Sequence, residues 1–112
     1  MNKPRITDDP LFTLLRTGQI EQFNALKKSG STCDLRGTDL SRTDLRGLDA
    51  DGLDLRDCYF RMADLRGIDF RNANLEGASF ADANISGVYF PKELSAEEIN
   101  MALAHGTRVR YR

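Results

Sequence analysis

The chain has 112 residues, of which 40% are hydrophobic and 29% charged, and its formal net charge is −1. This length builds one hydrophobic core and leaves no room for a second. The near-neutral balance excludes a strongly basic nucleic-acid-binding domain, and no stretch approaches the ~20 apolar residues of a membrane span. The opening MNKPRITDDP has no apolar signal-peptide region, so we expect a cytoplasmic protein.

Residues 1–30 are predicted to form a helical cap at the amino-terminal end of the domain. The Asp9-Pro10 dipeptide is a helix-start signal, and Gly18 interrupts the first helix. A second helical stretch covers residues 19–29 and is closed by a glycine. The apolar side chains that recur at helical spacing are Leu11, Leu14, Leu15, Ile20, Phe23 and Leu26.

The middle of the chain carries a five-residue repeat. Every fifth residue from Leu35 to Phe90 is apolar, and twelve such residues in a row have a chance on the order of one in ten thousand. Five is a multiple of neither 3.6 nor 2, so no straight helix or flat strand keeps these positions on one face. The chain must therefore coil around them. The twelve residues are Leu35, Leu40, Leu45, Ala50, Leu55, Phe60, Leu65, Phe70, Leu75, Phe80, Ile85 and Phe90.

The other positions of the repeat fit the same coil. Two residues before each apolar centre stands a small or apolar side chain, which suits a second inward position. An Asp, Asn or Ser lies between the two, except at Tyr59 and Tyr89, and glycine is frequent two residues after the centre. These residue types hydrogen-bond a turning backbone or adopt a positive φ. The unit is therefore small, polar, large apolar, polar, turn.

These units resemble a known family. CDLRG, TDLSR, TDLRG, ADLRG, ANLEG and ANISG, in register from Cys33 to Lys92, are similar to the tandem A(D/N)LXX units of pentapeptide repeat proteins. The resemblance implies an all-β solenoid over residues 31–92. This would be a right-handed, four-sided parallel β-helix with four pentapeptides per coil, about three coils and α-helical flanks at both ends. It also implies a bacterial protein, and it implies no chemistry.

Four units per coil stack residues that are twenty positions apart into four core ladders. Ala50 is smaller than its ladder partners, and an unfilled gap there would cost ~2–5 kcal/mol. We expect an apolar side chain of the amino-terminal segment to fill this corner, and the candidates are Phe12, Ile20, Phe23 and Leu26. The ladders are Leu35/Leu55/Leu75, Leu40/Phe60/Phe80, Leu45/Leu65/Ile85 and Ala50/Phe70/Phe90.

Residues 93–112 are predicted to form a capping helix and a basic tail. Ser95 and Glu98 make a capping box, and Gly106 ends the helix. His105, beside that end, suits the helix dipole better than a catalytic role. The last six residues alternate polar and apolar as a short strand does. The two caps would cover coil ends that otherwise expose unpaired backbone groups and invite end-to-end polymerisation.

Aspartate and arginine flank an inward residue at five places in the repeat. Both side chains of each pair should point outward at the same corner and neutralise one another. The repeat segment has a balance of only −3, so we expect a mixed-charge surface without a strong negative field. The pairs are Asp34/Arg36, Asp44/Arg46, Asp54/Arg56, Asp64/Arg66 and Asp69/Arg71.

Catalytic chemistry has little support in this sequence. His105 is the single histidine, and no other base or metal ligand joins it at a recognised spacing. Cys33 and Cys58 fall on different corners of the predicted coil, so we expect buried free thiols in a reducing compartment. We therefore expect a protein that is not an enzyme and that uses no cofactor and no metal.

The leading functional hypothesis is a non-catalytic protein-interaction or scaffold module with an unknown protein partner. It would be a monomer, or a homodimer through its carboxy-terminal segment. Exposed tyrosines are enriched in interface anchors, and two of them interrupt the repeat pattern. The candidate contact residues are Tyr59, Met62, Tyr89, Arg108, Arg110, Tyr111 and Arg112.

The alternative is a DNA-mimic modulator of a type II topoisomerase such as gyrase, acting as a dimer, as the resemblance implies for the best understood members. Three coils span about 14 Å, whereas one turn of duplex DNA spans about 34 Å. The length and the mixed charge both disfavour mimicry. Direct nucleic-acid binding rests on the tail alone, where three arginines surround an aromatic residue. We favour a structural role for this tail, and we expect no membrane binding.

Overall fold

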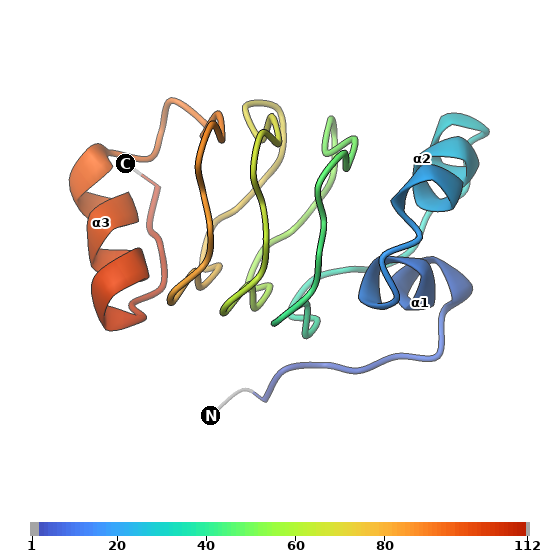
Figure 1. The fold of residues 1–112 in the computed structure, drawn as a ribbon, viewed down its shortest axis with the longest axis horizontal. Coiled ribbons are helices and arrows are strands. Elements are labelled where there is room, and N and C mark those ends of the chain that lie inside the picture. Colours follow the sequence, from blue (N-terminus) through green and yellow to red (C-terminus); the bar gives the residue numbers. More distant parts are fainter. Residues whose placement is uncertain (1–2, 112) are drawn as a thin grey trace.

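Three helices flank a stack of coils in the computed structural model, which describes residues 3–111. Helices α1 (Pro10–Arg16) and α2 (Ile20–Lys28) lie together at one end of the stack, and α3 (Ala96–His105) covers the other (Figure 1). The molecule measures 36 × 29 × 22 Å along its principal axes. No helix within residues 3–111 is long and apolar enough to cross a bilayer.

Both helices predicted in the amino-terminal segment form, and α2 is one residue shorter at each end than predicted. Pro10 is the first residue of α1, and the Asp9 side chain accepts a hydrogen bond of 2.8 Å from the Leu11 N–H. This bond satisfies one of the backbone donors that a helix start leaves without a partner. Gly18 separates the two helices at φ +75°, a backbone conformation that is strained for residues with a Cβ atom.

The coils occupy residues 33–92 and repeat every twenty residues. Parallel bridges join residues that are twenty apart, and each bridge is a single residue long. No continuous strand forms within residues 3–111, so the expected all-β solenoid is present only as coils joined by isolated bridges. A turn every five residues leaves too few extended residues on each side for a longer ladder. The bridges are Asp39–Tyr59, Asp44–Asp64, Asp54–Asn74, Tyr59–Ser79, Asp64–Asn84 and Asp69–Tyr89.

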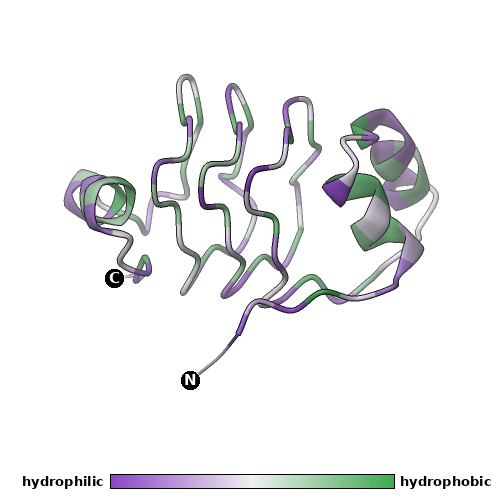
Figure 2. Cartoon of the chain, turned by 60° about the horizontal axis from the view of Figure 1, so that its bottom comes forward, coloured by the Kyte–Doolittle hydropathy of each residue, from purple (hydrophilic) through white to green (hydrophobic). Residues whose placement is uncertain are grey.

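The apolar centres of the repeat form the core, as their spacing predicts. Apolar and polar residues alternate along each coil (Figure 2). Phe60 and Phe80, twenty residues apart, stack with ring centroids 5.2 Å apart, as the ladder register requires. The other centres are buried, except that Ile85 and Phe90 on the third coil are partly exposed. These two residues lie on the last coil, which has no further coil above it.

The corner at Ala50 lies against the amino-terminal helices. Ala50 is buried in the same apolar cluster as Phe12, Ile20 and Phe23. Asn24 of α2 donates 2.9 Å to the Gly47 carbonyl and accepts from the Asp49 N–H, so α2 is fastened beside this corner. Leu26 was a wrong candidate for filling the corner, because its side chain faces outward and is 41% exposed.

The carboxy-terminal cap differs from its prediction in one contact. The Ser95 hydroxyl accepts from the Glu98 N–H at 3.2 Å, as a capping box requires, and Gly106 at φ +69° ends α3. The Glu98 carboxylate, however, accepts a hydrogen bond from the Arg110 N–H at 2.8 Å. The glutamate therefore fastens the residues that follow the helix, where a capping box would have it bind the helix start.

Residues 107–111 form a strap over the third coil. Arg108 and Ser79 make an antiparallel bridge. The Val109 N–H donates to the Ala78 carbonyl at 2.9 Å, and the Gly77 N–H donates to the Val109 carbonyl at 2.8 Å. Val109 is fully buried. The strap therefore supplies the hydrogen bonds that a fourth coil would have made at this side.

Candidate functional site

All five predicted Asp–Arg pairs form on the outer surface of the coils. In each pair the arginine donates to the aspartate two residues before it, through its side chain and through its backbone N–H. The N–O distances of the ion pairs lie between 2.6 and 3.0 Å. Arg46 also reaches Asp64 on the next coil at 3.5 Å, so neighbouring coils share a charge contact.

The position of each pair follows from the local turn. The aspartate side chain accepts from the backbone N–H two residues later, which fixes the turn after the apolar centre. Asn74 and Asn84 accept in the same way from Glu76 and Ser86, at 3.1 and 3.2 Å. The ion pair is therefore an addition to the turn, because asparagine accepts the same turn hydrogen bond without it.

The arginines hold the pKa values of their aspartates below the ordinary range. For Asp34, Asp44 and Asp69, hydrogen bonds from the arginine side chain and then from its backbone N–H lower the pKa to about 2. The ionised carboxylates and the guanidinium groups neutralise one another across the outer surface. The resulting surface has mixed charge, as the sequence predicts.

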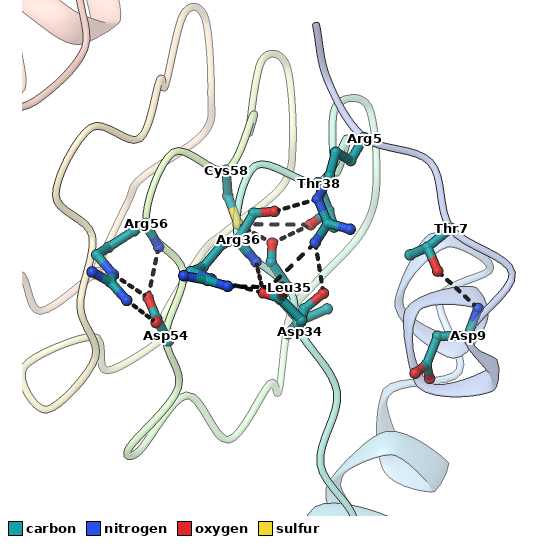
Figure 3. A network of polar contacts seen from close by, with 10 residues as sticks. All are labelled: Arg5, Thr7, Asp9, Asp34, Leu35, Arg36, Thr38, Asp54, Arg56 and Cys58. Carbon is teal, nitrogen blue, oxygen red and sulfur yellow. Dashed lines mark hydrogen bonds and ion pairs between the residues drawn. The ribbon is translucent and has the colours of Figure 1, made fainter. Parts of the chain in front are cut away.

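Arg5 closes the amino-terminal edge of the first coil (Figure 3). Its backbone pairs in parallel with Thr38, accepting 2.8 Å from the Asp39 N–H and donating 2.7 Å to the Gly37 carbonyl. Its guanidinium donates to the carbonyls of Arg36 and Asp34, at 2.8 and 2.9 Å. Arg5 thus takes the place of a preceding coil. Nothing in the sequence period marks this role, because Arg5 lies outside the repeat.

Tyr59 lies beneath the strap. The Arg108 guanidinium sits 4.9 Å from the Tyr59 ring centroid and donates to its hydroxyl and, at 2.9 Å, to the Gly77 carbonyl. Asp57 is 3.9 Å from the same guanidinium. Two of the predicted contact residues, Tyr59 and Arg108, therefore contact each other and hold the carboxy-terminal cap in place.

The remaining tail residues have mixed positions. The Tyr111 hydroxyl accepts from the Leu75 N–H at 2.8 Å and donates to the Ala73 carbonyl at 3.2 Å. Burial raises the pKa of Tyr111, so its hydroxyl stays protonated and keeps this donor. Arg110 has an exposed side chain, while Arg112 lies outside the described residues.

Tyr89 and Met62 are the two predicted contact residues that are exposed large hydrophobic side chains. Tyr89 is 55% exposed, and the Arg71 guanidinium lies 4.8 Å from its ring centroid. Met62 is 47% exposed and occupies a turn with φ +58°. Tyr89 belongs to the third coil and Met62 to the second, on a different side. The structure therefore separates them into two distinct surface positions.

The two cysteines are unpaired, as expected, but the expectation that both are buried is wrong for Cys33. Cys58 is buried and donates to the Leu35 carbonyl at 2.9 Å, while Cys33 is only half-buried. Burial raises the pKa of each thiol to about 11. Both thiols are therefore protonated at neutral pH and are poor nucleophiles.

A hollow of about 370 Å³ opens between the amino-terminal helices and the first coil. Leu11, Phe23, Leu35 and Leu53 supply its apolar lining, and Lys27 and Asp54 supply charge. Both charged side chains already have partners, because Lys27 pairs with Asp49 at 3.2 Å and Asp54 pairs with Arg56. Within residues 3–111 no group of three or more His, Cys, Asp and Glu side chains is placed to hold a metal ion.

The comparison with family profiles decides the assignment. The profile for pentapeptide repeats matches eight copies, over residues 31–61 and 54–91. The chain belongs to the pentapeptide repeat family. Neither a curated protein nor a solved structure matches it significantly. Membership in the pentapeptide repeat family indicates a repeat-based interaction or scaffold module, and it names no partner.

Proposed function

We propose that this pentapeptide repeat protein is a non-catalytic interaction or scaffold module that binds a protein partner in the cytoplasm. The observation that carries the proposal is Tyr89, an aromatic side chain 55% exposed on a rigid coil. The Arg71 guanidinium stacks on its ring and orients it before any partner arrives. A preoriented aromatic anchor loses little conformational entropy on binding, which favours a contact role.

We further propose that the coiled segment is the right-handed, four-sided β-helix of this family. The bridges support four sides, because each of the four pentapeptide phases contributes at least one of them. Representative pairs are Asp54–Asn74, Asp39–Tyr59, Asp44–Asp64 and Asp69–Tyr89. The hand of the coil follows from the family resemblance.

The charge distribution favours a protein partner over DNA mimicry. Five aspartates of the coils are directly paired with arginines, so they contribute little to a negative field. The coil stack itself is only about 14 Å long at the usual strand spacing, well below one turn of duplex DNA. A protein that imitates DNA needs a longer and more uniformly negative surface.

The test compares the intact chain with the Tyr89→Ser variant. Light scattering after gel filtration gives the mass, and affinity capture from a bacterial lysate with quantitative mass spectrometry gives the partners. We expect a partner that the intact chain retains and Tyr89→Ser loses, while Ser86→Ala, an exposed neighbour on the same coil, keeps it. Inhibition of gyrase supercoiling by an elongated dimer, together with unchanged capture by Tyr89→Ser, would favour the mimic instead.

A further inference from the structure

One corner of the coil stack has no glycine at its turn position on any of the three coils, whereas each of the other three corners has at least one. Arg42, Met62 and Asp82 follow one another at twenty-residue spacing and have φ of +57°, +58° and +57°. Turns at this φ favour glycine, and non-glycine residues other than Asn and Asp are uncommon there. Arg42 and Met62 are therefore held in an unfavourable backbone conformation. Such a conformation on a rigid frame suggests that the side chain itself is needed.

The same corner holds the arginines of the coils that lack an ion pair. Residues 33–92 contain seven arginines, and five of them lie within 4 Å of an aspartate. The remaining two are Arg42 and Arg61, which form no ion pair with any described residue. The Arg42 N–H donates to the Arg61 carbonyl at 2.8 Å, so the two residues are direct neighbours on adjacent coils.

Asp39 does not neutralise the charge of Arg42. Asp39 is influenced by the charge of Arg42, but it accepts hydrogen bonds from Ser41 and lies 4.0 Å from Arg16. Arg16 also donates to the Ser41 carbonyl at 2.8 Å, which fixes it beside Asp39. Asp39 therefore already has a cationic neighbour of its own. The side chains of Arg42 and Arg61 are therefore two exposed cationic groups beside the exposed Met62.

We infer that this corner, made by Arg42, Arg61 and Met62, docks an acidic segment of a partner protein that carries one apolar side chain. The inference rests on the proposed interaction role and names the class of partner. Carboxylates of the segment pair with the two guanidinium groups, whose planar donors match a carboxylate. The apolar side chain covers Met62, whose flexible thioether adapts to different shapes.

Two features favour an acidic peptide over a nucleic acid at this corner. The central residue is Met62, which gives an apolar contact but no aromatic face on which a base stacks. Asp82 on the third coil ends the column with a negative charge, so a continuous phosphate backbone would meet repulsion there. A peptide can place its carboxylates over the first two coils alone.

The test selects binders from a displayed library of random dodecapeptides against the full chain. We expect the selected peptides to be enriched in Asp and Glu around one apolar residue. Fluorescence anisotropy of a selected peptide should show affinity weakened at least about tenfold by R42S/R61S. The matched control R36S/R66S also removes two positive charges, but from arginines that are paired with aspartates. It should leave the affinity within about twofold. M62G should weaken binding without lowering the melting temperature, because glycine relieves the turn.

The contrary outcomes separate this inference from the proposed function. Peptides that R42S/R61S still binds but Tyr89→Ser does not would overturn the assignment of this corner and leave the interaction role standing. A basic consensus, or tighter binding of a labelled single-stranded oligonucleotide than of any peptide through these arginines, would also overturn it. A library that yields no binder to any surface would count against both.

Discussion

At the scale of single residues, the aspartate of each repeat has two structural roles. In Asp64, one carboxylate oxygen accepts from the Arg66 N–H at 3.3 Å and shapes the turn, while the other pairs with the Arg66 guanidinium at 2.7 Å. Asn84, one coil later, performs only the first role. The chain thus contains its own comparison between a turn with an ion pair and a turn without one.

Substitutions at Asp64 should separate these two roles. Asp64→Asn keeps the acceptor for the Arg66 N–H and loses only the ion-pair contacts with Arg66 and Arg46 on the outer surface, where such pairs contribute little. Asp64→Ala also loses the turn hydrogen bond and should unfold about 1 kcal/mol more easily than Asp64→Asn. Urea unfolding at pH 7 measures the difference. Equal stability of the two variants would mean that the turn does not depend on this acceptor.

Stability should decrease modestly in acid. The pKa of Asp34, Asp44 and Asp69 is about 2 in the folded protein, below the ordinary value near 4 that the unfolded chain has. Their contribution is therefore present above about pH 4 and is lost as the pH falls toward 2. Urea midpoints between pH 7 and pH 2 measure this. D34N/D44N/D69N should show a shallower acid dependence, and an unchanged slope would refute the assignment.

Residue positions inside the repeat were predictable, whereas contacts from outside it were not. The pairing of Asp34 with Arg36 follows from spacing alone, because side chains on both sides of an inward residue share a corner. The half-burial of Tyr59 does not, because the residue that covers it, Arg108, is 49 positions away. Arg5 likewise meets its partners some thirty residues later, and no local pattern announces such a contact.

At the scale of elements, the two caps replace a missing coil with different kinds of hydrogen bonds. The amino-terminal cap uses long side chains, since Arg5 and Arg16 donate to backbone carbonyls of the first coil and Asn24 both donates and accepts. The carboxy-terminal cap uses backbone, since Val109 pairs with the third coil as a strand would. The helices were predictable from their start and stop signals. The hydrogen bonds that fasten them were not, because they depend on how each helix lies on the coil.

The packing at Ala50 gives a test of the amino-terminal cap. Because Ala50 is 2% exposed and lies in one cluster with Phe12 and Phe23, a larger side chain has to displace its neighbours. Ala50→Leu should therefore destabilise the protein by about 1–3 kcal/mol, as overpacking does. Thermal unfolding followed by circular dichroism measures the change. Stabilisation by more than about 1 kcal/mol would show instead that the corner is empty.

At the scale of the whole molecule, the caps decide whether the coil stack ends or continues. The strap covers Gly77 and Ala78 on the outer edge of the third coil, and the Asp82 N–H donates to the Leu103 carbonyl of α3 at 3.2 Å. A coil without these contacts would offer unpaired backbone groups to a second molecule. The sequence therefore predicts that both ends are covered, although it does not identify the covering residues.

Removal of residues 107–112 should therefore promote association. The truncated chain loses the Val109 hydrogen bonds and uncovers Tyr59, so its mass by light scattering should rise with concentration. Deletion of Arg112 alone keeps residues 107–111 and should leave the mass unchanged. A truncated chain that keeps the mass of the intact protein over the same concentrations would show that α3 suffices to close the end.

Because the register repeats every twenty residues, the distance between the two caps can change only in steps of one coil. Each bridge between two coils joins a residue to its equivalent one coil away, as Asp44 is joined to Asp64 and Asp64 to Asn84. A duplication of one complete coil would move α3 away from α1 and α2 by about 4.8 Å and leave every local contact with an equivalent. An insertion of a single pentapeptide would instead turn one cap a quarter of the way around the axis. Evolution can therefore lengthen this protein only in whole coils without also rebuilding its ends.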